Sequence, residues 1–158
     1  MSVVDLPPVL PPAQQEMVLC AVQMAQRYHL PANVLLAVAE QEGGRPGQWV
    51  RNDNGTYDVG ALQFNTAYLA DLRRFGITPA DVADRGCYPY ELAAWRIKKH
   101  VVEDKGSFWK RVANYHSRNS APNQRYQSLI KPRAQKWWRW LTANYATHDL
   151  TETEVARN

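Results

Sequence analysis

Long hydrophobic runs are missing from this sequence of 158 residues. No apolar stretch approaches the roughly 20 residues that a helix needs to span a bilayer, so we expect no membrane insertion. The stretch MSVVDLPPVLPP at residues 1–12 has neither a basic segment nor an apolar core, and therefore does not resemble a secretory signal. If the chain is exported, its signal has been removed or replaced by a starting Met.

Cysteine is scarce, with Cys20 and Cys87 the two present. They form neither a Cys-x-x-Cys pair nor a Cys/His pattern with metal-ligand spacing, which argues against a metal site or a redox motif. The two residues are either one disulfide or two buried thiols. In an oxidising compartment, a bridge closing a loop of about 68 residues would contribute roughly 4 kcal/mol on the chain-entropy model. We expect neither a metal nor an organic cofactor.

Hydrophobic residues make up 45% of the chain and charged residues 22%, a balance typical of a globular domain rather than a disordered one. The net charge of +4 and the pI near 9.2 suit an anionic partner. Nucleic acid, a membrane surface and an acidic polymer such as peptidoglycan all meet that description, and charge alone does not choose among them.

Apolar residues at helical spacing predict a mainly α-helical domain over residues 13–148, between an extended proline-rich arm at 1–12 and a polar tail at 149–158. Asn33 is the expected N-cap of a helix that ends at Glu42, Ser107 caps a later helix, and Pro132 is expected to begin the last one. The other predicted helices cover about 14–29, 68–75 and 90–103. No internal repeat is found.

The stretch VLLAVAEQEGG, residues 34–44, ends an apolar helix with two carboxylates and two glycines. At 100° per residue, Glu42 falls on the face of the apolar residues, whereas Glu40 lies on the opposite side and is interpreted as a solvated glutamate. Gly43 ends the helix, because glycine accepts the left-handed conformation. Burial and the negative end of the helix dipole both raise the pKa of Glu42, which makes it a candidate acid/base.

Residues 43–65 are rich in Gly, Asn and Asp, and we expect a long loop with a small hairpin that turns at residues 53–55. Long loops in compact domains are usually functional or disordered. Asp58 lies in this loop, and with Glu42 it would form two carboxylates in unlike environments, as glycosidases use. The alternative is that Asp58 is a turn former that hydrogen-bonds its own backbone.

Four pieces of sequence stand in a specific order: Glu42-Gly43, the stretch NDNGTYDVGALQFN at 52–65, Cys87, and the stretch ANYHS at 113–117. Together they resemble the lytic transglycosylases of the lysozyme superfamily, in particular the small members that accompany type IV secretion, conjugation and type III secretion machines. The resemblance spans about residues 16–140. It implies a lysozyme-like helical fold with a small loop and hairpin region after the catalytic helix.

By this resemblance, Glu42 is the catalytic acid/base and Asp58 assists it. As an acid, Glu42 would protonate the glycosidic oxygen between N-acetylmuramic acid and N-acetylglucosamine. As a base, it would then act on the muramoyl 6-hydroxyl, which closes onto C1 and leaves a 1,6-anhydro product without external water. The 2-acetamido group of the substrate supplies nucleophilic help, so a second carboxylate is dispensable in many members.

The resemblance also implies five substrate-binding residues. Gln63 lines the sugar groove, where its amide can donate and accept hydrogen bonds. Tyr115 matches a tyrosine whose hydroxyl lies near the catalytic glutamate, and Tyr126 is a second groove tyrosine. Asn65 and His116 complete the set.

Three positions depart from the family pattern. Gly43 stands where a Ser often helps to orient the acid, Ala-Leu at 61–62 replaces Leu-Met, and His116 replaces Asn. Cys20 and Cys87 fall where secretion-associated members have a bridging pair, which implies a disulfide and a periplasmic location.

The resemblance therefore predicts a periplasmic monomer that cleaves peptidoglycan glycan strands for an envelope-spanning secretion or conjugation machine. A hydrolytic muramidase, in which Asp58 helps water or a covalent intermediate, is one alternative. A peptidoglycan-binding assembly factor with weak catalysis is another.

The basic, Trp-rich stretch at residues 131–140 permits a third alternative, single-stranded nucleic-acid binding through Arg133, Lys136 and Arg139. We favour core packing by Trp137 and Trp138 beneath a solvated basic face. We accordingly expect no nucleic-acid partner.

Overall fold

The structure is a computed structural model that describes residues 10–144. The predicted arm, apart from residues 10–12, and the predicted tail lie outside this range. The described elements are α1 (Pro12–Tyr28), α2 (Ala32–Glu42), β1 (Trp49–Arg51), β2 (Tyr57–Val59), β3 (Phe64–Asn65), α3 (Thr66–Leu72), the 3-10 helix η1 (Arg73–Phe75), α4 (Pro79–Ala83), α5 (Tyr88–Glu103), α6 (Phe108–Ala113) and α7 (Ser120–Asn144). The prediction of a mainly α-helical domain is confirmed. None of the helices in this range combines the length and apolarity needed to cross a bilayer.

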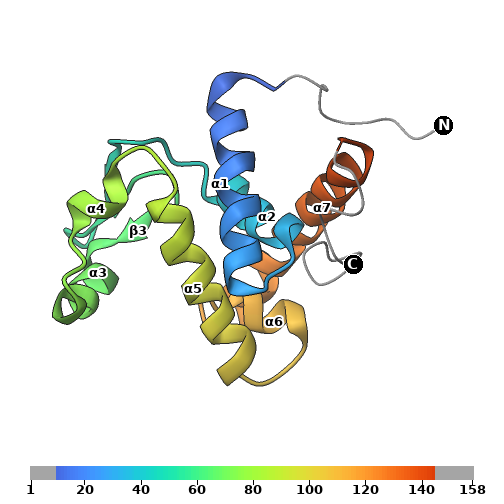
Figure 1. The fold of residues 1–158 in the computed structure, drawn as a ribbon. Coiled ribbons are helices and arrows are strands. Elements are labelled where there is room, and N and C mark those ends of the chain that lie inside the picture. The colour runs from blue at the N-terminus through green and yellow to red at the C-terminus, as the bar shows by residue number, and fades with distance from the viewer. Residues whose placement is uncertain (1–9, 145–158) are drawn as a thin grey trace.

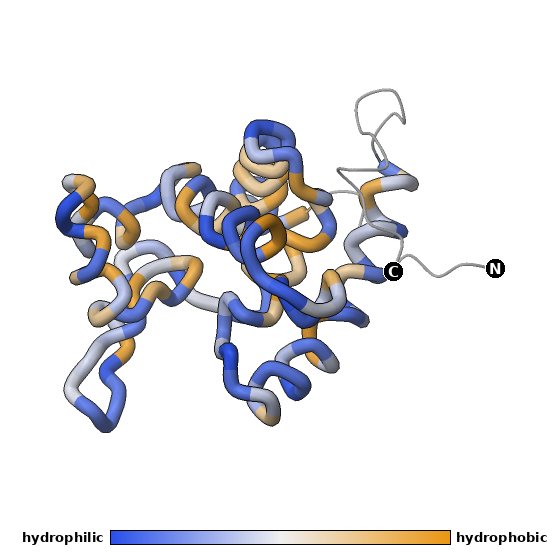
Figure 2. Tube along the Cα trace, turned by 90° about the horizontal axis from the view of Figure 1, so that it is seen from below, coloured by the Kyte–Doolittle hydropathy of each residue, from blue (hydrophilic) through white to orange (hydrophobic). Residues whose placement is uncertain are grey.

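Helix α2 lies at the centre of the hydrophobic core. All of residues 32–39 are buried, and the helix packs most extensively against α7 and next against α1. Figure 1 shows α1, α2 and α7 together on one side of α5, with α3, α4 and β3 gathered on the other. In Figure 2 the hydrophobic segments concentrate where the central helices meet, and the hydrophilic ones follow the outer loops.

Asn33 does not cap α2, contrary to the prediction. The N-cap is Pro31, whose carbonyl accepts the N–H groups of Val34 at 3.1 Å and Leu35 at 3.4 Å. Asn33 is fully buried inside the helix, and its Nδ2 donates to the carbonyl of Ala134 in α7 at 3.0 Å. Because a buried amide requires a partner, the contact with α7 determines the role of this side chain.

Helix α7 begins at Ser120, well before the predicted start at Pro132, which lies inside the helix. A proline inside a helix removes a hydrogen bond and usually kinks or breaks it. Pro132 is exposed, while Tyr126, Ile130 and Ala134 are buried at helical spacing. Burial of this continuous apolar stripe outweighs the cost of the proline.

The polar side of the contact between α2 and α7 includes an ion pair. Both carboxylate oxygens of Glu40 lie 2.7 Å from Nζ of Lys136, and Nε1 of Trp137 donates to the same carboxylate at 3.1 Å. The interpretation of Glu40 as a freely solvated glutamate is therefore wrong. Trp137 is fully buried as predicted, whereas Trp138 is only partly buried and Trp140 is buried in its place.

The three strands form one antiparallel sheet in the order β1-β2-β3. The hairpin between β1 and β2 turns as predicted, with the N–H of Gly55 donating to the carbonyl of Asn52 at 3.1 Å. Asp58 lies in the middle of β2, opposite Val50 on one side and Asn65 on the other. The sheet therefore sets the position of the second carboxylate.

A disulfide joins Cys20 in α1 to Cys87, the residue before α5. The pairing implied by the family resemblance is confirmed. Because α5 stands between the two groups of elements in Figure 1, this bridge secures the central helices to the helix that borders the sheet.

The disulfide predicts a measurable share of the stability. Replacing both cysteines, as Cys20→Ala/Cys87→Ala, should lower the free energy of unfolding by about 4 kcal/mol, because the unfolded chain regains the freedom of a long loop. Urea unfolding without reductant measures this difference. Reductant should destabilise the wild type by a similar amount and leave the double variant unchanged. A loss under about 1 kcal/mol would contradict the prediction.

Candidate active site

Glu42 is the last residue of α2. The helix stops after it because Gly43 takes a left-handed conformation, with φ of 64°, and its N–H donates to the carbonyl of Ala39 at 3.0 Å. The buried helix thus carries a carboxyl from the core to the edge of the polar loop, where the side chain of Glu42 is partly buried. This position agrees with the prediction made from helical periodicity.

Tyr126 of α7 is the direct partner of Glu42. Its side chain is almost fully buried, and its hydroxyl donates to Oε2 of Glu42 at 2.6 Å. The sequence suggested Tyr126 as a groove tyrosine and placed the hydroxyl of Tyr115 near the acid instead. In the structure, the Tyr115 hydroxyl donates to the carbonyl of Leu62 at 3.3 Å.

Burial raises the pKa of Glu42 from 4.5 to about 7. Loss of water around the carboxylate is the largest cause, and the negative charge of Asp58 acts in the same direction. The hydrogen bond from Tyr126 and the positive charge of Arg96 oppose it, because both stabilise the ionised form. The predicted direction of the shift is confirmed, and the carboxyl is about half protonated near neutral pH.

Asp58 is held by side-chain amides. Its Oδ1 accepts from Nδ2 of Asn65 at 3.0 Å and from Nδ2 of Asn52 at 3.2 Å. Asn65, predicted to bind substrate, also caps α3 by accepting the N–H of Ala67 at 2.9 Å. Asp58 is thus a fixed strand residue, and the alternative in which it serves as a local turn former does not describe its contacts.

Gln63 lies close to Gly44, two residues after the end of α2. Its backbone has an unusual φ of 54°, and its Nε2 donates to the carbonyl of Gly60 at 3.0 Å. Gly44 makes the close approach possible, because a Cβ there would lie 2.1 Å from the carbonyl oxygen of Gly60 and 2.7 Å from Nε2 of Gln63. A strained, tightly packed glutamine next to Gly44 is the kind of conformation that functional sites maintain.

Arg96 of α5 is a candidate site residue that no sequence motif indicates. Its guanidinium lies between two rings, 4.0 Å from the centroid of Tyr68 and 4.4 Å from that of Tyr115. It also donates to the carbonyl of Tyr115 at 2.8 Å. No local motif marks a cation placed between two aromatic residues from distant segments, so only the assembled fold reveals this position.

His116 stacks on Tyr126, with ring centroids 4.8 Å apart and planes 4° from parallel. Partial loss of water around the ring and the positive charges of Arg125 and Arg96 lower the pKa of His116, which keeps the imidazole neutral near pH 7. The histidine therefore covers the tyrosine that holds the acid without adding a positive charge.

The predicted residues consequently form two polar groups. One contains the acid with its tyrosine and the stacked histidine, and the other contains Asp58 with its two amides. Tyr115 is buried beneath them and contacts Arg96, and Cys20 and Cys87 contribute no contact to either group. Across residues 10–144, no three His, Cys, Asp or Glu side chains gather as metal ligands would.

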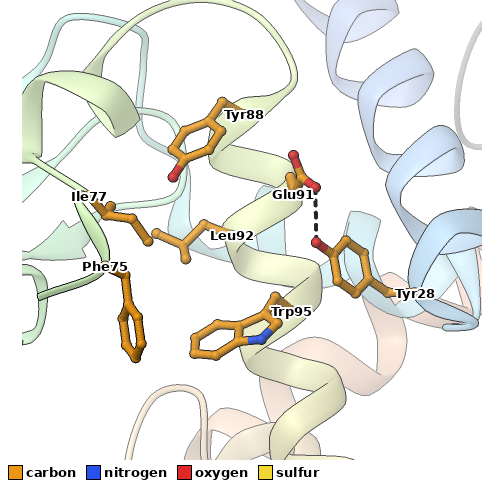
Figure 3. A pocket seen from close by; sticks show the side chains of 7 residues that line it. All are labelled: Tyr28, Phe75, Ile77, Tyr88, Glu91, Leu92 and Trp95. Carbon is orange, nitrogen blue, oxygen red and sulfur yellow. Dashed lines mark hydrogen bonds between the residues drawn. The ribbon is translucent and has the colours of Figure 1, made fainter. Parts of the chain in front are cut away.

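Two of the hollows that border α5 share Trp95 in their lining. A cleft of about 630 Å³, here called the α5 cleft, is lined by residues of α3, η1 and α5 and by the segment after α6, and shares Tyr68, Arg96 and His116 with the site. A smaller pocket of about 380 Å³ contains none of the predicted site residues. Figure 3 shows this smaller pocket as mostly apolar, with the hydroxyl of Tyr28 donating to Glu91 on one wall.

The fold and site define a mainly helical domain with a candidate acid/base site, and comparison with known proteins gives distant relatives. The chain is 25% identical to Invasion protein IagB of Salmonella typhimurium over 120 residues, which are 75% of this chain and 72% of the relative. It is 27% identical to Protein IpgF of Shigella flexneri over 111 residues, which are 70% of this chain and 72% of the relative. No family model matches the chain. The likeness agrees loosely with the resemblance to lytic transglycosylases.

The raised pKa of Glu42 predicts a pH-dependent loss of stability. Since the folded-state pKa, about 7, lies above the unfolded value, 4.5, stability is full below pH 4.5 and falls as the pH rises through 7. Glu42→Gln cannot ionise, so its advantage over the wild type should grow across this range to about 3 kcal/mol. Urea unfolding at several pH values measures it.

Glu40→Gln is the matched control for that measurement. It weakens the pairing with Lys136 and should reduce stability at neutral pH rather than increase it. A Glu42→Gln variant with no pH-dependent gain would contradict the assigned environment of Glu42.

Proposed function

We propose that this protein is a peptidoglycan lytic transglycosylase that cleaves the β-1,4 bond between N-acetylmuramic acid and N-acetylglucosamine. The observation that carries the proposal is the partly buried Glu42, with a pKa near 7 and a hydroxyl donor at 2.6 Å. A reaction in which one residue acts first as acid and then as base is fastest when its pKa lies near the working pH. The motif resemblance and the two distant relatives support a cell-wall role.

In the first step, protonated Glu42 transfers its proton to the glycosidic oxygen, and the bond from that oxygen to C1 of the muramoyl sugar breaks. The acetamido group of the same sugar stabilises the developing positive charge at C1. Tyr126 donates to the carboxylate that forms, which stabilises the ionised product of this step. The tyrosine is thereby a positioning residue for the acid.

In the second step, the carboxylate of Glu42 takes the proton of the muramoyl 6-hydroxyl, and the oxygen of that hydroxyl bonds to C1. The product is the 1,6-anhydro sugar, and Glu42 returns to its protonated state. No water is consumed. A carboxyl with a pKa near 7 serves both steps, because neither its protonated nor its ionised form is strongly disfavoured.

Asp58 assists by placing negative charge near the reacting sugar. Asn52 and Asn65 hold its carboxylate, so its position is defined before substrate binds. The same geometry supports a hydrolytic muramidase as a second candidate, because two carboxylates in unlike environments are the usual glycosidase pair. In that reaction, water or a covalent intermediate replaces the 6-hydroxyl, and the product has a reducing end.

The Cys20–Cys87 disulfide supports an oxidising compartment, and we place the protein in the periplasm as a monomer. The proposed role is to open the wall locally for an envelope-spanning secretion or conjugation machine. Lys136, one of the cations considered for nucleic-acid binding, pairs with Glu40, which does not favour that alternative.

Mass spectrometry of fragments released from purified peptidoglycan tests the proposal. The wild type should release anhydro-muropeptides, and Glu42→Gln should release at least a hundredfold less because it has no proton to transfer. Asp58→Asn should retain part of the activity. Reducing-end products would favour the muramidase, and peptidoglycan binding without release by the wild type would favour an assembly factor.

Tyr126→Phe tests the pairing with Glu42. Removing the hydroxyl removes a contact that favours the ionised carboxylate, so the pKa of Glu42 should rise and the high-pH limb of kcat/KM should move to higher pH. Loss of positioning should also reduce kcat by roughly tenfold, the effect of one charge-assisted hydrogen bond. The measurement is initial rate against pH.

Tyr28→Phe is the matched control, since the Tyr28 hydroxyl also donates to a glutamate, Glu91, away from the site. Its pH profile should equal that of the wild type. An unshifted profile for Tyr126→Phe would contradict the role assigned to this tyrosine.

A further inference from the structure

The α5 cleft shares lining residues with the candidate active site. His116, which stacks on Tyr126, the partner of Glu42, lines the cleft. The other lining residues include Tyr68, Arg96, Phe75 and Trp95. Phe75 and Trp95 also line the neighbouring apolar pocket, where Figure 3 shows both rings. A polymer bound across Glu42 therefore has this cleft, about 630 Å³ in volume, beside it.

The lining of the α5 cleft is strongly charged and of mixed sign. Four cationic side chains and three carboxylates contribute to it: Arg74, Arg96, Lys99, Arg118, Asp71, Glu103 and Asp104. Asp104 is already satisfied, because it accepts from Asn114 at 2.8 Å, lies 2.6 Å from His100 and pairs with Arg118 at 3.1 Å.

Arg74 and Lys99 each contact an aromatic ring instead of a carboxylate. The guanidinium of Arg74 lies 4.8 Å from the ring centroid of Phe75, and Nζ of Lys99 lies 5.3 Å from that of Trp95. Among residues 10–144, neither cation has a carboxylate within 4.0 Å. An aromatic face orients a cation without using its hydrogen-bond donors, so both groups remain able to bind an anion.

A neutral glycan offers hydroxyl and acetamido groups to such a lining, but no ionised group that would pair with its charges. In peptidoglycan the ionised groups belong to the stem peptides, which carry several carboxylates and, in many cell walls, a free ammonium group. We propose that the α5 cleft binds the stem peptide, with its carboxylates on Arg74 and Lys99 and its ammonium group facing Asp71 and Glu103. This inference rests on the proposed function and defines its substrate as peptide-bearing strands.

The two cations lie on different elements, since Arg74 belongs to η1 and Lys99 to α5. A peptide that contacts both therefore bridges the two walls of the cleft. Charge-assisted contacts from two walls discriminate against a ligand without ionised groups. Such a ligand would leave both cations without an anionic partner. The cleft would thus select strands by their peptides while Glu42 acts on the sugar.

Competing substrates test this selection. Chain-length-matched glycan strands are prepared with their stem peptides and after removal of the peptides by an amidase. The lactyl carboxylate that the amidase exposes is converted to a neutral methyl amide, and anhydro ends are counted for each substrate. The wild type should give at least tenfold higher kcat/KM on the peptide-bearing strands. Arg74→Gln/Lys99→Gln should lower this ratio toward one. A wild-type ratio near one, or an unchanged ratio in the double variant, would overturn the inference.

Lys131→Gln is the matched control, because Lys131 is exposed on α7 and does not line the cleft. It should preserve the wild-type ratio. Cleavage of both strands at equal rates would refute the peptide site and leave the transglycosylase proposal intact, so the two failures are distinguishable.

A binding measurement tests the cleft without turnover. The free tripeptide L-alanyl-γ-D-glutamyl-meso-diaminopimelate is titrated into Glu42→Gln and followed by amide chemical shifts. The shifts should concentrate at residues 71–75, 95–104 and 114–119. Adding Arg74→Gln and Lys99→Gln should weaken binding at least fivefold. No shifts in these segments, or equal affinity in the triple variant, would overturn the inference even if the protein lacks catalytic activity.

Discussion

The packing of α7 along α2 is the constraint on which the rest of the site depends. Helix α2 is buried along residues 32–39, so a carboxyl on its last turn leaves water as the helix packs. The same packing brings Tyr126 to that carboxyl, since the two residues lie on different helices and meet through their side chains. The contact of Asn33 with α7 and the pairing of Glu40 with Lys136 set how the helices align. The packing of the core therefore determines the environment of Glu42.

Placing a carboxyl there opposes folding, because desolvation disfavours its ionised form. The structure limits this cost with one hydroxyl donor and one cation, Tyr126 and Arg96, which favour ionisation without cancelling the upward shift. A salt bridge directly on Glu42 would lower its pKa further and remove its ability to donate a proton near pH 7. The arrangement accordingly exchanges some stability for an acid that is poised at neutral pH, a common compromise in active sites.

Arg96 links the two parts of the molecule. It lies between rings from α3 and from the segment after α6, and its charge reaches Glu42. The disulfide secures the start of α5, the helix that carries Arg96, to α1. Contacts on both sides of α5 therefore help to maintain the relative position of Glu42 on α2 and Asp58 on β2. The α5 cleft lies on the same helix, which places its charges at a fixed position relative to the acid.

Local patterns predicted most of the helices and part of the site. The hydrophobic periodicity placed Glu42 at the end of an apolar helix. The conformational preferences of glycine predicted that this helix ends at Gly43 and that a hairpin holds Asp58. The direction of the Glu42 pKa shift also followed, because helix face and helix end are local properties. The motif resemblance supplied the pairing of Cys20 with Cys87.

The predictions that the structure contradicts share one physical cause. Asn33 is a good cap and Pro132 a good first residue when each is considered by itself, yet burial of α7 against α2 placed both inside helices. The partner of Glu42, the ion pair of Glu40 and the site of Arg96 were likewise decided by the tertiary structure, because each joins residues far apart in the chain. The sequence by itself determined which side chains are available and on which face of a helix they lie. Only packing decided which of them meet, since that depends on how the largest apolar surfaces are removed from water.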